Sequence, residues 1–285
     1  VCSSDLERGK LDGEIVVRSP ATSPEARDDL MVHTQGIKID RQSIRTFNDV
    51  EFRYGESTGR GRGLEITIAQ DSSESKKGKK KSSLGGIQSV TLSKLDYLRL
   101  ATAGQGLLGN AIPSAPVAQP AKANEAAPLE ITCRGEFVFD VATQRIRFRD
   151  RVEVRRLLPS LPPDQLHCGE LLLELGTPPV TAMIAPPNDP MAGRLKRIIA
   201  LGSPAILEAP SSGLYATAAH MEYAVTDRNV VLKSDAKRQL PHVELRQFDQ
   251  HFVAPELLYQ MAEEGKLGRL RAAGPGELQI GRAHV

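Results

Sequence analysis

Apolar and polar residues alternate with a period of two through much of this sequence, and the alternation limits what the chain can fold into. It is clearest in residues 135–175, GEFVFDVATQRIRFRDRVEVRRLLPSLPPDQLHCGELLLEL. Successive side chains of a β-strand point to opposite faces, so this segment predicts short strands with one apolar face and one arginine-rich face. We expect very little helix. Residues 251–268 could form one, but we favour a strand over residues 257–261 because the matching segment ELLLEL has a strand pattern.

The same pattern recurs along the chain. Three pairs of segments align, at separations of 84, 86 and 72 positions: FDVATQRIRFRDRV with YAVTDRNVVLKSDA, ELLLEL with ELLYQM, and GRLKRIIALGSPAIL with GKLGRLRAAGPGELQ. A weaker copy, KIDRQSIRTFNDVEF, places Asp40 at the position of Asp140 and Val50 at that of Val152. Repeated strands that cannot bury their own apolar face stack on their neighbours. The sequence therefore predicts an all-β chain: an elongated antiparallel β jelly roll of about three repeated units, or a row of small sandwiches.

The chain divides at its changes of composition. The first six residues, VCSSDL, and the last six, IGRAHV, read as translated sequencing adapter, so we expect artefacts at both ends and a fragment between them. Residues 84–101 predict two strands. The predicted divisions are 1–29, artefact plus disordered linker with one short strand at 14–17; 30–101, a first β unit with a basic loop at 70–83; 102–128, a flexible linker; 129–280, two repeats at 129–208 and 214–280; and 281–285, artefact.

Composition excludes few function classes but weighs against two. The net charge is +2 and Trp is absent, which argues against nucleic-acid binding and against ligand binding through aromatic stacking. The KKGKKK run has no interleaved aromatic residues, so we interpret it as a solvated loop. No apolar run reaches the length of a membrane span and no signal peptide is visible. An upstream anchor would be missing from a fragment.

We find no pattern typical of a catalytic or metal site. The six His residues do not pair at metal-ligand spacing with other His, Cys or acidic residues, and no nucleotide-binding or serine-hydrolase motif occurs in context. Asp140, Asp150 and Glu153 could suggest a two-carboxylate hydrolase. Their neighbours are arginines, so we favour a solvated charged face. We expect no enzymatic activity, no cofactor and no metal.

Several degenerate motifs together resemble the periplasmic lipopolysaccharide-transport bridge family, the OstA-like or Lpt proteins. In residues 129–280 they are ITCRGEFVFD, FRDRVEV, LHCGELLLEL and IIALGSPAIL, then ATAAHMEYAV, VELRQF, FVAPELLYQM and LRAAGPGEL, which is similar to LptA. Residues 32–68, VHTQGIKIDRQSIRTFNDVEFRYGESTGRGRGLEITI, resemble the membrane-tethered member, LptC. The resemblance implies a V-shaped β jelly roll whose interior carries the acyl chains of a glycolipid.

The resemblance also implies a function, a place and partners. We expect binding and transport of a lipopolysaccharide-like glycolipid across the periplasm, pairing with other Lpt-type modules through edge strands, and a membrane tether outside this fragment. The expected lipid-lining residues are Ile37, Ile39, Val50, Phe52, Leu64, Ile66, Phe137, Phe139, Ile146, Phe148, Val152, Val154, Leu171, Leu173, Met221, Tyr223, Val230, Leu232, Val243, Leu245, Leu257 and Tyr259. The alternative is a structural or polysaccharide-binding β scaffold of the cell envelope, in which the same residues form a closed core.

Two cysteines remain once Cys2 is set aside with the terminal artefact. Cys133 and Cys168 occupy matching small-residue positions in successive predicted strands. Stacked strands could bring them close enough to form a disulfide, which an oxidising periplasm would favour. The alternative, which we favour slightly, is that both are small buried side chains.

Overall fold

The prediction of an all-β chain is confirmed. A computed structural model describes residues 8–19, 29–68, 87–100, 128–158, 161–176, 195–260 and 269–280. The strands are β1 (Arg8–Ser19), β2 (Leu30–Asp40), β3 (Ser43–Tyr54), β4 (Ser57–Ile68), β5 (Ile87–Leu100), β6 (Leu129–Thr132), β7 (Phe137–Asp140), β8 (Arg145–Arg156), β9 (Asp164–Leu175), β10 (Leu195–Ala209), β11 (Leu214–Ala224), β12 (Asn229–Lys233), β13 (Val243–Gln247), β14 (Gln250–Ala254), β15 (Glu256–Gln260), β16 (Arg269–Ala273) and β17 (Glu277–Ile280). Two 3₁₀ turns, η2 (Pro210–Ser212) and η3 (Ala236–Arg238), complete the elements.

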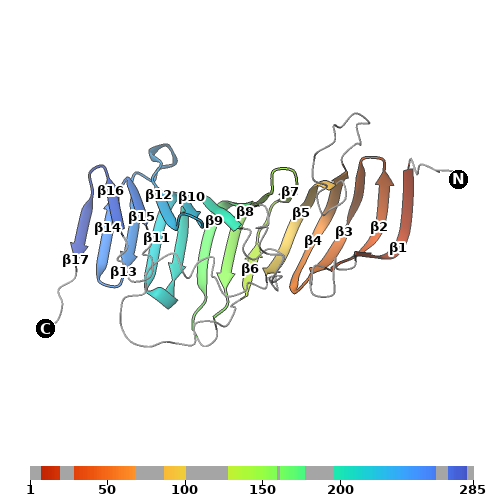
Figure 1. The fold of residues 1–285 in the computed structure, drawn as a ribbon, viewed down its shortest axis with the longest axis horizontal. Helices are drawn as coiled ribbons and strands as arrows, with labels where there is room; N and C mark the ends of the chain where they lie inside the picture. The colour runs from red at the N-terminus through yellow and green to blue at the C-terminus, as the bar shows by residue number, and fades with distance from the viewer. Residues whose placement is uncertain are drawn as a thin grey trace.

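The strands follow one another along a single long axis. All pairings are antiparallel, and they join the 17 strands into one sheet. Strands β1 to β5 pair in sequence order, β5 pairs with both β6 and β7, and both of these pair with β8. The two termini lie at opposite ends of the molecule (Figure 1). The elongated antiparallel β jelly roll predicted from the sequence is therefore the fold.

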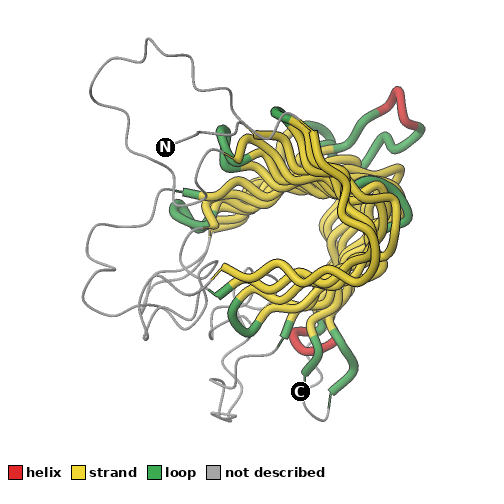
Figure 2. Tube along the Cα trace, turned by 90° about the vertical axis from the view of Figure 1, so that its right-hand side faces the viewer, coloured by secondary structure: helices red, strands yellow, loops and turns green. Residues whose placement is uncertain are grey.

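The sheet is bent lengthwise into two arms. Arm A contains β7, β12, β15 and β16 with the adjoining halves of the long strands, and arm B contains β6, β13, β14 and β17 with the other halves. Seen along the axis, the strands curve through an arc that does not close on itself (Figure 2). The buried apolar residues of both arms form one continuous core on the inner side of this arc.

The bend is made by interruptions of regular pairing. In β1 and β2 the register shifts beside Gly13 and Gly36, whose φ angles of 89° and 58° suit glycine. In β8 the shift falls between Arg149 and Val152, and the intervening Asp150 and Arg151 both have positive φ. A bulge of this kind turns a strand without ending it, so one long strand can serve both arms.

The hairpins of the second and third units have the same geometry. Each has a four-residue turn, 141–144 or 225–228, whose last residue has positive φ: 55° at Gln144 and 53° at Arg228. In each turn the first residue, Val141 or Val225, donates its N–H to a carbonyl of the neighbouring strand over 2.8 Å. The two turns are 84 positions apart, which is the separation at which the segments 139–152 and 223–236 align in sequence.

The arginine-rich face of the predicted strands lies outside. Arg145 pairs with Glu174 at 2.8 Å, and Arg197 lies 3.8 Å from Glu174 and 3.2 Å from Glu222. These side chains alternate with the buried apolar ones along their strands. Solvent screens such pairs, so each contributes little to stability, and their main effect is to keep the outer face of arm A polar.

Three predictions about elements are corrected. The range predicted as disordered linker contains the twelve-residue strand β1, which extends well beyond the predicted 14–17 because all of it pairs along β2. Residues 84–101 contain one strand, β5, instead of two, because β5 continues through a local shift in its pairing with β4. Residues 145–156 likewise form one bent strand. The basic segment 70–83 and residues 102–127 of the linker lie outside the described residues.

Candidate functional site

Three rows of mostly apolar side chains run along the inner surface, each formed by residues paired directly across successive strands. The arm A rim row is nearest the hairpin turns, the arm A inner row lies two residues closer to the bend, and the arm B row crosses the other arm. The rim row is Ile39, Ile44, Ile66, Val90, Phe139, Ile146, Leu173, Ile198, Tyr223, Val230, Tyr259 and Leu270. The inner row is Leu64, Leu92, Phe137, Phe148, Leu171, Ala200, Met221, Leu232 and Leu257. The arm B row is Val32, Phe52, Gly59, Leu98, Ile131, Val154, Leu166, Leu207, Ala216, Leu245 and Phe252.

Burial differs between the rows and along them. Every residue of the inner row is buried, and Phe148 and Leu171 have no exposed surface. The rim row is buried only in the middle of the molecule, at Ile146, Leu173 and Ile198, and is half-buried towards both ends. The arm B row follows the same trend. The inner surface therefore has two half-exposed apolar stretches separated by a closed middle, and the described residues form no uninterrupted exposed trough.

The predicted lining residues fall into two groups. The half-buried group is Ile39, Phe52, Ile66, Phe139, Tyr223, Val230, Leu245 and Tyr259. The buried group is Ile37, Val50, Leu64, Phe137, Ile146, Phe148, Val152, Val154, Leu171, Leu173, Met221, Leu232, Val243 and Leu257, which form the core. Sequence reasoning missed members of the same rows, Ile44, Val90, Ile198, Leu207, Phe252 and Leu270 among them. Five of these six lie in β5, β10, β14 and β16, from which no lining residue was predicted, so the period-two pattern of those strands is the signal that could have found them.

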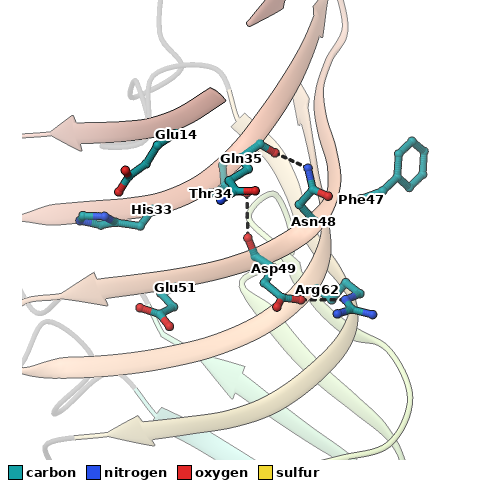
Figure 3. Close-up of a pocket in the computed structure, with 9 residues that line it drawn as sticks. All are labelled: Glu14, His33, Thr34, Gln35, Phe47, Asn48, Asp49, Glu51 and Arg62. Atoms are coloured by element: carbon teal, nitrogen blue, oxygen red, sulfur yellow. Dashed lines mark hydrogen bonds and ion pairs between the residues drawn. The ribbon is translucent and has the colours of Figure 1, made fainter. Parts of the chain in front are cut away.

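A polar hollow of about 530 Å³ lies on the outer face of the first unit. Its walls include Glu14, His33 and Glu51, and none of the predicted lining residues takes part. Figure 3 shows that Asp49 joins two strands here: its carbonyl accepts from the Thr34 hydroxyl over 2.9 Å, and its carboxylate pairs with Arg62 at 2.8 Å. The hydrogen bond from Arg62 lowers the pKa of the Asp49 carboxyl. Most of the residues around this hollow are polar or charged, and Phe47 is the one apolar side chain that lines it.

Two of the three carboxylates considered for a hydrolase site have structural partners, and the third, Asp150, lies in the β8 bulge. Asp140 accepts from the backbone N–H of Thr143 over 2.9 Å and so closes the turn of the second unit. Glu153 forms an ion pair with Arg155 on the same strand. Among the described residues, no group of three or more His, Cys, Asp and Glu side chains could hold a metal ion. No helix in the described part of the chain is long and apolar enough to cross a membrane.

The disulfide considered between Cys133 and Cys168 is not formed. Both residues are free, buried thiols in this structure. Burial raises the pKa of Cys168 to about 12 and also raises that of Cys133. A thiol with so high a pKa is almost entirely protonated at neutral pH and is a poor nucleophile. The structure thus has the alternative arrangement, in which both cysteines are small core residues.

Sequence comparisons with known proteins give no match: neither a protein-family model nor a curated protein matches the chain. Seven chains among the solved structures match. One of them is LptH, the LptA-homologous periplasmic component of the lipopolysaccharide transport device of Pseudomonas aeruginosa. LptH and this chain share 15% sequence identity at a TM-score of 0.36, and the match covers 55% of this chain and 96% of LptH. At this level the similarity carries no argument about function, which must come from the inner rows.

Proposed function

We propose that the chain binds a lipopolysaccharide-like glycolipid through its acyl chains and helps to carry it across the periplasm as a module of an Lpt-type bridge. The observation that carries the proposal is the half-exposed apolar stretch of the third unit. There Tyr223, Val230 and Tyr259 line arm A, and Leu245 and Phe252 line arm B. Tyr223, Val230, Leu245 and Phe252 pack against the core without being enclosed by it, and Tyr259 is also half-buried. Contiguous apolar surface that a fold leaves partly open typically marks a binding site.

Acyl chains suit this surface on energetic grounds. Each methylene removed from water contributes about 0.8 kcal/mol, so a few chains lying along the rows would be held firmly without directed hydrogen bonds. No reacting group is needed for binding or for passage from one module to the next. Movement in one direction would require an energy source in another component.

Replacing Val230 by glutamine is expected to weaken the binding of lipid A by about tenfold, because the substitution places an amide against the acyl chains. Val231→Gln is the matched control: Val231 is also half-buried, is the next residue in β12, and points to the outer face. Isothermal titration of both variants and the unchanged chain with detergent-solubilised lipid A measures the difference. Equal affinities for the two variants, or no binding by the unchanged chain, would contradict the proposal.

One observation favours a second candidate, a structural β scaffold. In the middle of the molecule all three rows are closed: Ile131, Val154 and Phe148 have no exposed surface. A scaffold needs nothing more than this core and the charged outer face. It predicts that lipid A does not bind and that Val230→Gln changes only stability, so the same titration separates the two functions.

The proposed partners are β modules that add to the free edges of the sheet. Among the described strands, β1 pairs only with β2, and β17 pairs only with β14. Exposed apolar residues lie on these edges, including Val16 at 41% and Leu278 at 55% exposure. Unpaired strands of this kind accept a further strand. A second copy is a convenient partner, so we expect the sedimentation coefficient to rise with protein concentration; a strictly monomeric chain would contradict edge pairing between copies.

A further inference from the structure

The rim row of the third unit differs from that of the second at matched positions. The separations of 84 and 86 that align the segments also relate the pairs Ile146–Leu173 and Val230–Tyr259 across the sheet. Three positions near the turn then correspond: Phe139 to Tyr223, Leu173 to Tyr259, and Gln144 to Arg228. In the third unit, phenols stand in place of two apolar side chains of the second unit, and a guanidinium stands in place of an amide. The three differences lie in or next to one part of the rim row.

The register brings the two phenols to one place. Val230 is paired with Tyr223 on one side and with Tyr259 on the other, so all three lie side by side on the inner face. Arg228 ends the turn that leads into β12 and precedes Val230 by two positions. Arg228 is exposed and lies at the outer margin of the half-exposed apolar stretch, beside the half-buried Tyr223 and Tyr259.

Two polar groups of this cluster, the Arg228 guanidinium and the Tyr259 hydroxyl, lack hydrogen-bond partners among the described residues. In the second unit, Gln144 donates from Nε2 to the carbonyl of Val141 over 2.7 Å. Arg228 has neither a hydrogen bond nor an ion pair with any residue that the structure describes. The Tyr259 hydroxyl is sealed from solvent and has no hydrogen-bond partner among those residues. A buried polar atom without a partner destabilises a fold unless something else satisfies it.

The charge of Arg228 acts on both phenols. Burial raises the pKa of Tyr223 and of Tyr259, and Arg228 opposes the shift in each case. Both hydroxyls therefore stay protonated at neutral pH and can donate hydrogen bonds. A cation with two O–H groups beside it can donate hydrogen bonds from all three side chains, which suits an anionic oxygen acceptor.

We propose that Arg228, together with the hydroxyls of Tyr223 and Tyr259, binds a phosphate group at the margin of the apolar stretch. The guanidinium can donate two parallel N–H groups to phosphate oxygens, and the phenols can donate to the same group. With the phosphate held there, acyl chains of the same molecule would extend along Val230 and Leu270. The inference rests on the proposed lipid binding, and it adds the chemical class of the head group and the residues that hold it.

Two lipids with identical chains test the inference: dioctanoyl phosphatidic acid carries a phosphate and dioctanoylglycerol does not. We expect the unchanged chain to prefer the phosphatidic acid in isothermal titration. Arg228→Gln, which restores the residue of the second unit, should reduce that preference by about tenfold, and Tyr259→Phe should reduce it less. Arg271→Gln is the control, because it removes one positive charge from the opposite face of β16 and should leave the preference unchanged. Tyr259→Phe should not lower the melting temperature of the lipid-free chain, since the hydroxyl it removes has no described partner.

The outcomes are distinguishable. Equal affinity for the two lipids, or a preference that survives Arg228→Gln, overturns the phosphate site and leaves the proposed lipid binding intact. Binding of neither lipid overturns both. Competition by inorganic phosphate at concentrations comparable to the lipid would keep the phosphate site and assign it to free phosphate in place of a lipid head group.

Discussion

Replacing Phe148 by alanine is expected to lower the free energy of unfolding by about 3–5 kcal/mol. Phe148 has no exposed surface and lies at the centre of the inner row, paired with Phe137 on one side and Leu171 on the other. Its ring centroid is 5.3 Å from that of Phe137. Alanine would lose the transfer free energy of the ring. It would also leave a cavity, because the backbone hydrogen bonds of the sheet prevent the strands from closing over the space.

The matched control for this substitution is Phe47→Ala. Phe47 is 76% exposed on the outer face at the bend of β3, so its removal should change stability by no more than about 0.5 kcal/mol. Urea unfolding followed by far-ultraviolet circular dichroism measures both variants. Similar midpoints for the two would mean that Phe148 is not enclosed and that the middle of the molecule is open.

The strand register could be predicted from sequence, since alternation and internal repeats determine it. Segments that align in sequence at separations of 86 and 72 positions hold equivalent places in the sheet: Leu173 pairs with Ile198, and Tyr259 pairs with Leu270. Because a slip of one residue would turn every apolar side chain outward, the apolar pattern leaves one register possible. For this reason the repeated segments can be aligned from sequence, and many of the inner-facing residues can be identified.

The bend could not be predicted in the same way. Apolar residues keep the same phase on both sides of the bulge at Asp150 and Arg151, so nothing in the alternation marks the point where the strand bends. The exposure of the inner side chains could not be predicted from sequence either. Ile146 and Val230 occupy matched positions in the rim row, yet Ile146 is buried and Val230 is half-buried. The difference depends on what packs around each residue across the two arms, and local sequence does not contain that information.

Asp164 is a residue whose importance is invisible in sequence. It follows the polar connection PSLPP and would pass for part of a solvated loop. In the structure it begins β9 with a fully buried side chain. Its carboxylate accepts from the backbone N–H and the hydroxyl of Ser211, over 3.2 and 2.7 Å, and lies 3.6 Å from a guanidinium nitrogen of Arg156. One side chain therefore ties the β8–β9 pair to the turn η2, 47 residues later in the chain.

Asp164→Ala is expected to lower the free energy of unfolding by about 3–5 kcal/mol, because it leaves the largely buried charge of Arg156 without its partner. The Nε atom of Arg156 would not compensate for the lost ion pair, because it is already buried with no hydrogen-bond partner among the described residues. Asp235→Ala is the control: Asp235 accepts from the backbone of Lys237 at the start of η3, but its side chain is 37% exposed, so its loss should cost only about 1 kcal/mol. Urea midpoints that fall equally for the two variants would show that burial adds nothing to the Asp164 contacts. A larger fall for Asp164→Ala would show that this buried carboxylate, and not apolar packing alone, holds the β8–β9 pair against η2.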